Sequence, residues 1–113
     1  MEEMHMTNQQ TAKLILDRAK PLFKRKYNVQ YRIKVVFDHY DHQFNFYMIR
    51  YKPGHITRVT PLHHVESTWI ADLEEILNLI EKDLKLTIVF TGFEGIKWDS
   101  RNSYIQRPKR KVG

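Results

Sequence analysis

The spacing of apolar residues changes twice along the chain, and this change constrains the fold more than any other feature. From residue 12 to residue 23, apolar side chains recur every three or four positions, which is the period of one helix face. Thr7 and Gln10 have the spacing of a capping box, so we expect the helix to begin there. Pro21 removes a backbone donor and disfavours helical geometry at Lys20, where the helix is expected to end or bend.

Apolar and polar residues then alternate from residue 27 to residue 37, the period of a half-buried strand. A turn-forming segment at 38–42 separates this strand from a second one at 43–52. Apolar residues occupy both sides of the second strand, which indicates either a central position in a sheet or one aromatic face open to a partner. Pro53 and Gly54 suit a type II turn into a third strand at 55–60, which Pro61 is expected to close.

The helical period returns after residue 67, where Ser67 or Thr68 can cap a second helix. The predicted apolar face of this helix consists of Trp69, Leu73, Ile76, Leu77, Ile80 and Leu84. A short run rich in β-branched residues at 86–90 predicts a buried fourth strand. Because each element has one apolar side to bury, we predict an α+β fold of order α-β-β-β-α-β, a mostly antiparallel four-stranded sheet with two helices packed on one face.

The length of 113 residues fits a single domain. We expect 1–6 to be a tag-derived or disordered start, 7–99 to form the α+β domain, and 100–113 to form a basic flexible C-terminal tail. The sequence has no Cys, which excludes disulfides, thiolate metal sites and cysteine nucleophiles and favours a cytoplasmic location. No apolar run has the length of a membrane span, so no membrane partner is expected.

Positive charge is concentrated in two regions of this chain, whose net charge is +6. Residues 7–65 carry eleven Lys or Arg against three acids, residues 66–99 carry three against eight, and residues 100–113 add five without an acid. Because Lys and Arg attract phosphate and exposed aromatic rings stack on bases, the pattern indicates nucleic-acid binding. The candidate residues are Lys24, Arg25, Lys26, Arg32, Lys34, Arg50, Lys52, Arg58, Arg107, Lys109, Arg110 and Lys111.

The strand cations among these candidates are expected to share the open face of the sheet: Arg32, Lys34, Arg50, Lys52 and Arg58. The hypothesis is therefore a small non-enzymatic basic protein that contacts nucleic acid through a basic and aromatic sheet face and its tail. Frequent Lys, Ile, Asn and Tyr are typical of AT-rich coding sequence, which favours an accessory protein of a phage or plasmid. The simpler alternative is that outward Lys and Arg only keep the sheet soluble and protect its edges.

Two other functions compete with this hypothesis. The separation of a basic half from an acidic second helix also suits an adaptor or inhibitor that docks on an acidic protein, or a homo-oligomer in which the two charges meet. A metal-dependent hydrolase would use His39, His42, His63, His64 and Glu66. The sequence has no HExxH, G-x-S-x-G or phosphate-binding glycine motif, and histidines in surface turns are common. We therefore rank the hydrolase last and expect no metal, no cofactor and no catalytic residue.

Overall fold

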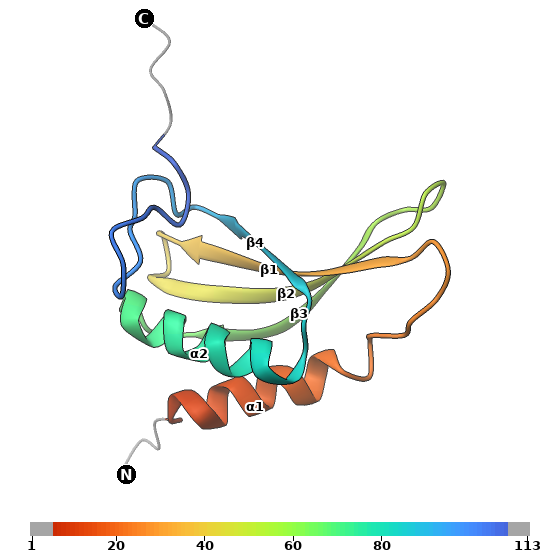
Figure 1. The fold of residues 1–113 in the computed structure, drawn as a ribbon, viewed down its shortest axis with the longest axis horizontal. Coiled ribbons are helices and arrows are strands. Elements are labelled where there is room, and N and C mark those ends of the chain that lie inside the picture. Colours follow the sequence, from red (N-terminus) through yellow and green to blue (C-terminus); the bar gives the residue numbers. More distant parts are fainter. Residues whose placement is uncertain (1–5, 109–113) are drawn as a thin grey trace, which may run out of the picture.

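The computed structural model describes residues 6–108, which form one compact α+β domain (Figure 1). The order of the elements is α-β-β-β-α-β, as predicted. Their bounds are α1 Asn8–Ala19, β1 Gln30–Asp38, β2 Gln43–Tyr51, β3 Arg58–Val65, α2 Ile70–Asp83 and β4 Thr87–Thr91.

The strands form one four-stranded sheet in the order β3-β2-β1-β4. The pairs β1–β2 and β2–β3 are antiparallel and β1–β4 is parallel, so the predicted mostly antiparallel sheet is confirmed. β4 is parallel to β1 because the chain crosses back through α2 before it enters the sheet again. β2 lies between β3 and β1, in the central position that its two apolar sides indicated.

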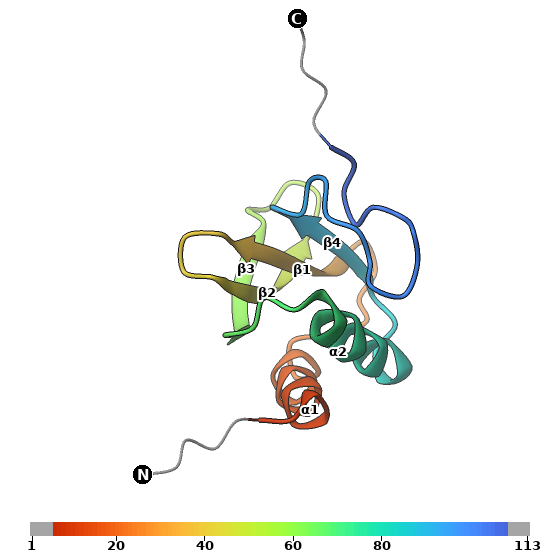
Figure 2. The ribbon, with the colours of Figure 1, turned by 90° about the vertical axis from the view of Figure 1, so that its left-hand side faces the viewer.

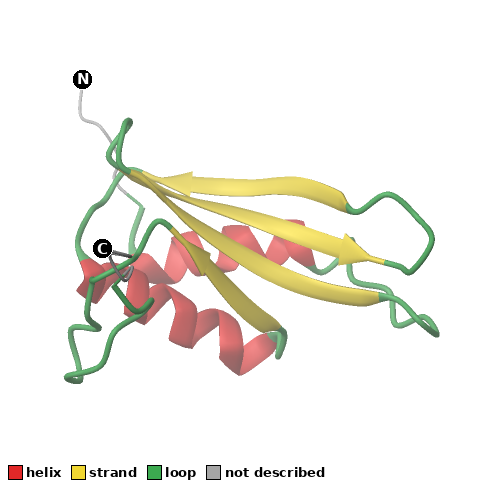
Figure 3. Cartoon of the chain, turned by 90° about the horizontal axis from the view of Figure 1, so that it is seen from above, coloured by secondary structure: helices red, strands yellow, loops and turns green. Residues whose placement is uncertain are grey.

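Both helices lie on the same face of the sheet, as Figure 2 shows. The buried core combines side chains of α1, the inward positions of β1 and β2, and the apolar face of α2, with fully buried Ile15, Ile33, Phe46 and Ile76 among them. The opposite face of the sheet carries no helix and is turned toward the viewer in Figure 3. The predicted one-sided packing is therefore confirmed. None of the helices within residues 6–108 has the length and apolar character needed to cross a bilayer.

Local signals at the ends of α1 act as expected. The Thr7 hydroxyl accepts a hydrogen bond from the Gln10 backbone N–H at 3.1 Å, and the Gln10 side-chain oxygen accepts one from the Thr7 N–H at 2.9 Å. This reciprocal pair is the predicted capping box. The helix ends at Ala19, immediately before Lys20 and Pro21.

The turns on either side of β2 also lie where the sequence predicts them. The Asp38 carboxylate accepts hydrogen bonds from the backbone N–H groups of Tyr40 and Asp41, both at 3.0 Å, and these bonds lower the pKa of Asp38. Gly54 has φ of +80°, and the His55 N–H donates to the Lys52 carbonyl at 3.1 Å. The positive φ that was predicted for the Pro53-Gly54 turn is thus present.

The predicted start of α2 is wrong in two respects. Trp69 is 74% exposed and is not part of the apolar face. It occupies the N-cap position with extended backbone angles, so its side chain does not follow the helical face, although its spacing to Leu73 and Ile76 is helical. Ser67 does not provide the side-chain cap either; its hydroxyl accepts from the Trp69 N–H and donates to Asp72.

β3 differs from its prediction because it begins at Arg58 instead of residue 55 and continues through Pro61 to Val65 instead of ending at Thr60. A proline lacks the N–H of a sheet ladder, and it is tolerated on an edge strand or at a bulge. β3 satisfies both conditions, since it is the outer strand beside β2 and its register shifts between Phe46 and Tyr47. β1 begins at Gln30 rather than Tyr27, after Asn28 with φ of +64°.

The segment after β4 folds back on the body, which the sequence did not predict. Phe93 is fully buried and packs against Phe37, Phe44 and Phe90. The Phe93 N–H donates to the Gln106 side chain at 2.7 Å, and the Ile105 N–H donates to the Ile96 carbonyl at 2.8 Å. Residues 100–106, expected to belong to a flexible tail, are therefore hydrogen-bonded to residues 93–98.

Gly92 should be far less tolerant of substitution than Gly95, although both have positive φ. A Cβ at Gly92 would lie 2.7 Å from the Phe37 carbonyl oxygen, whereas a Cβ at Gly95 would meet nothing within 4 Å. We expect Gly95→Ala to lower the free energy of unfolding by about 1–2 kcal/mol. Gly92→Ala adds a backbone clash and should cost about 3 kcal/mol or more. Urea unfolding of the two variants measures the difference, and equal losses would contradict the close approach.

Candidate nucleic-acid interface

Two basic segments meet at one end of the molecule. Residues 20–34 and 50–58 together contain nine Lys or Arg and no Asp or Glu. The first segment leads from α1 into β1, and the second contains the β2–β3 hairpin (Figure 1). They meet because β1 begins where β2 ends, with Gln30 paired to Tyr51. We call this part of the molecule the basic end.

The loop that carries the first cations is held against the sheet by an aromatic contact. The ring of Phe23 packs edge-on against Tyr31 of β1, with centroids 5.1 Å apart and an interplanar angle of 72°. The Phe23 N–H also donates to the Ala19 carbonyl at 3.1 Å, which fixes the loop to the end of α1. Because Phe23 is anchored, Lys24 and Lys26 are kept beside the ends of β2 and β3.

A cleft of about 360 Å³ opens at this position on the helix side of the sheet. Four cations line it, and they come from the α1–β1 loop, from β2 and from β3: Lys24, Lys26, Arg50 and Arg58. The remaining lining residues are Pro21, Leu22, Tyr31, Met48 and Thr60, none of which is acidic. We refer to this hollow as the basic cleft.

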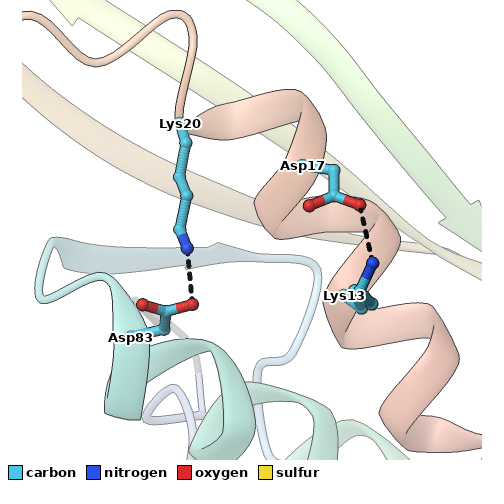
Figure 4. Close-up of polar contacts among 4 residues, drawn as sticks. All are labelled: Lys13, Asp17, Lys20 and Asp83. Carbon is cyan, nitrogen blue, oxygen red and sulfur yellow. Dashed lines mark hydrogen bonds and ion pairs between the residues drawn. The ribbon is translucent and has the colours of Figure 1, made fainter.

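The four cleft cations are not neutralised by any carboxylate of residues 6–108. The ion pairs of this part of the chain join Lys13 to Asp17, Lys20 to Asp83 and His64 to Glu66. Figure 4 shows that Lys20, at the start of the α1–β1 loop, reaches Asp83 of α2, with 2.6 Å between Nζ and Oδ2. Lys20 is therefore excluded from the set of unpaired cations. Like charges gathered in a concave site raise the local concentration of anions.

The sheet register divides the predicted strand cations between two faces. Arg50 pairs with Tyr31 and with Arg58, so these three residues face the helix side. Arg32 pairs with Ile49 and Lys34 pairs with Tyr47, which places both cations on the helix-free side. The prediction that Arg32, Lys34, Arg50, Lys52 and Arg58 share one face is therefore wrong. The physical reason is the alternation of β2, where Arg50 has the same parity as the buried Phe44, Phe46 and Met48.

The helix-free side of the sheet carries aromatic and aliphatic side chains beside these two cations. Tyr47, Ile49 and Tyr51 form a row along β2. Lys34 and Arg32 lie next to this row on β1, and Pro61 and Val59 lie next to it on β3. We call these seven residues the open face. A hollow of about 250 Å³ adjoins it, lined by Gln30, Arg32, Ile49, Tyr51, Thr57 and Val89.

The other predicted contact residues are distributed differently. Arg25 and Lys52 lie at the basic end, in the α1–β1 loop and directly after β2. Arg107 follows the fold-back segment at 93–106, which lies at the opposite end of the sheet from the hairpin (Figure 1). Lys109, Arg110 and Lys111 lie outside the described residues. Arg107 therefore does not extend the cluster at the basic end.

Three histidines of the candidate hydrolase site, His39, His63 and His64, make contacts within the fold, and His42 lies in the β1–β2 turn with φ of +54°. His39 stacks on Phe37 with ring centroids 4.1 Å apart, and its Nε2 lies 2.6 Å from the Gly92 carbonyl oxygen. His64 lies 3.8 Å from a Glu66 oxygen, and its ring stacks on His63. Within residues 6–108, no three His, Cys, Asp or Glu side chains are grouped closely enough to hold a metal ion.

The acidic side chains of α2 are partly occupied by contacts within the chain. Asn8 donates to Asp72 at 3.1 Å and to Glu75 at 3.2 Å. Hydrogen bonds from Ser100, including its backbone N–H at 3.3 Å, lower the pKa of Glu74. Glu74 and Glu81 also line a groove of about 470 Å³ between α2 and β4. This groove and the basic cleft share no lining residue.

Comparison of the chain with protein families, with curated proteins and with solved structures finds no match. The site therefore has to be interpreted from its own geometry. Sequence reasoning identified the cations but missed the cleft, because Lys24 and Lys26 meet Arg50 and Arg58 only through tertiary packing. It also missed Gln30, Thr57 and Val89 around the open-face hollow. Pairing of β4 with β1 brings Val89 there, and no local pattern contains that information.

The stability of the protein should decrease as the pH falls below the ordinary pKa of histidine. Burial lowers the pKa of His63 below 6.5, and the charges of Arg18 and His64 lower it further. The folded state thus favours neutral His63, so this contribution to stability is complete above pH 6.5 and is lost as the pH falls from there toward the lowered value. Urea unfolding near pH 7.5 and pH 5.5 should show a smaller loss in His63→Gln than in the wild type. An equally steep loss in both proteins would contradict this assignment.

Proposed function

We propose that the protein is a non-enzymatic nucleic-acid-binding protein that holds a sugar–phosphate backbone at its basic end. The observation that carries the proposal is the basic cleft, where four cations from three segments converge without a carboxylate. Arginine and lysine side chains form charge-assisted hydrogen bonds with phosphate oxygens. A cleft of this composition is suited to one or more phosphate groups.

A polymer fits the distribution of charge better than a small anion. Arg25 and Lys52 lie at the same end of the molecule outside the cleft lining, and Arg32 lies on the opposite face of the sheet there. A small anion inside the cleft would leave these side chains without a ligand. A nucleic-acid strand carries a charge on every nucleotide and gains affinity from each counterion that it releases.

Binding without catalysis is supported by the positions of the side chains that could do acid–base chemistry. His63, His64 and Glu66 lie at the end of β3 that pairs with Phe44 and Phe46, whereas Arg58 begins the same strand at the basic end. His39 is in contact with the Gly92 carbonyl oxygen. No histidine or carboxylate lines the basic cleft.

A second candidate function is that of an adaptor for an acidic protein. The observation that favours it is the separation between the basic end and the groove between α2 and β4, whose charged lining residues are Glu74, Glu81 and Arg101. Complementary fields of this kind steer association between proteins. One experiment separates the two candidates. A second protein recovered together with this one should stay bound after nuclease treatment only if the protein is an adaptor.

Removing two cleft cations should reduce both the affinity and its dependence on salt. We expect Arg50→Gln combined with Arg58→Gln to make the negative slope of log K against log salt less steep, by about 1.4 for single strands or about 1.8 for duplexes. Fluorescence anisotropy of a labelled oligonucleotide over a series of salt concentrations measures both quantities. Loss of like charge from the cleft should not destabilise the fold.

The matched control is Lys13→Gln combined with Lys97→Gln, which changes the net charge by the same amount. Lys13 lies on α1 paired with Asp17, and Lys97 lies in the fold-back segment. This control should keep nearly the wild-type affinity. If the two double variants lose affinity equally, net charge and not the cleft governs binding. Wild-type binding that ignores salt would refute the proposal.

A further inference from the structure

We propose that the nucleic acid bound by this protein is single-stranded and that its bases lie on the open face, stacked on Tyr47 and Tyr51. This inference rests on the proposed function and names its ligand class. It begins from a surface that the core packing leaves uncovered, because both helices lie on the other side of the sheet (Figure 3).

The composition of the open face is unusual for a surface in contact with water. Outward positions of an antiparallel sheet are normally polar when one face is solvated. Here Tyr51 is 46% exposed, Val59 is 55% exposed and Pro61 is exposed, while Tyr47 and Ile49 are half-buried. An apolar patch rimmed by charge marks a site of interaction rather than a solvated surface.

The cations beside the patch point to the class of the ligand; the carboxylates of Asp38 and Asp41 line a separate hollow with Tyr47 and Pro61, toward the β1–β2 turn. Lys34 is the cross-strand partner of Tyr47, and Arg32 is the cross-strand partner of Ile49. Neither cation forms an ion pair within the described part of the chain. Aromatic rings with a parallel row of cations are suited to a strand whose bases lie on the rings while its phosphates meet the cations. A protein partner without acidic side chains would leave Arg32 and Lys34 unpaired.

The distance between the rings of Tyr47 and Tyr51 favours binding of a different base on each ring. Tyr47 and Tyr51 are four residues apart on β2, about 13.6 Å at 3.4 Å per residue of an antiparallel strand. The rings therefore cannot enclose one base, and Ile49 lies between them. Gln30 and Arg32 also line the hollow beside Tyr51, and an amide and a guanidinium can form hydrogen bonds with the edge of an unpaired base.

The open face and the basic cleft are adjacent at the basic end. Arg50 and Tyr51 are consecutive residues of β2, so their side chains point to opposite faces of the sheet. A flexible single strand that leaves the cleft can pass over this end of the sheet and reach the open face. A duplex is too stiff to make that turn over a few nucleotides, and its paired bases are not available for stacking on tyrosine.

The experiment compares Tyr47→Leu and Tyr51→Leu in binding a labelled oligothymidylate and a duplex of equal length. Each substitution should weaken binding of the single strand by about 5- to 150-fold, the range for loss of one base–aromatic stack, while leaving duplex binding unchanged. Tyr51→Phe keeps the ring and should restore the affinity. The matched control is Tyr40→Leu, because Tyr40 is 93% exposed in the β1–β2 turn at the other end of the sheet.

The outcomes separate this inference from the proposed function. If the wild type binds the duplex at least as tightly as oligothymidylate, or if the leucine variants retain wild-type affinity for the single strand, the inference fails while binding at the basic cleft stands. Failure of the wild type to bind either oligonucleotide overturns both. If the leucine variants lose a protein partner but not oligothymidylate, the open face is a protein-docking surface and the inference fails. Thermal unfolding of Tyr51→Phe beside Tyr51→Leu separates loss of stacking from loss of folding.

Discussion

Burial of both helices against one face of the sheet is the constraint on which the rest of the molecule depends. Ile15 of α1, Ile76 of α2 and Phe46 of β2 belong to the same core, so the chain has one apolar layer between helices and sheet. The alternation of each strand then fixes which side chains remain outside this layer. Tyr47, Ile49 and Tyr51 are left on the opposite side because Phe44, Phe46 and Met48 are needed inside.

The same alternation creates the concentration of positive charge. Arg50 continues the buried side of β2 beyond the point where the helices cover it, and the anchored loop after α1 brings Lys24 and Lys26 to the same place. Repulsion among unpaired cations opposes folding, and the only cation of the loop that is neutralised by an acid of residues 6–108 is Lys20. Such an arrangement is unfavourable in isolation and becomes favourable when an anion binds, as is expected of a binding site.

Much of the fold was predictable from local signals, whereas the site depends on pairing between distant segments. The capping box at Thr7 identified the start of α1. The alternation of residues 44–51 identified the two sides of β2. The path of β3 through Pro61 was not predictable, because it requires knowing that this strand is at the edge and contains a bulge. Burial of Phe93 against Phe37 and Phe44 and its hydrogen bond to Gln106 likewise involve residues far apart in sequence. The face of Arg50 was not predictable from β2 alone, because both sides of this strand carry apolar residues and only its pairing with β1 and its packing place Phe44, Phe46 and Met48 inside.

The most direct test of the whole interpretation is to follow backbone amide chemical shifts by NMR as oligothymidylate is added to the protein. Changes are expected along 47–51, at 30–34 and 57–61, and in the loop at 22–27, since these segments form the open face and the basic cleft. The β1–β2 turn and the first turns of α2 should remain unchanged. Changes concentrated on α2 and the β1–β2 turn, with residues 47–51 unaffected, would contradict the assignment of function to the open face and the basic cleft.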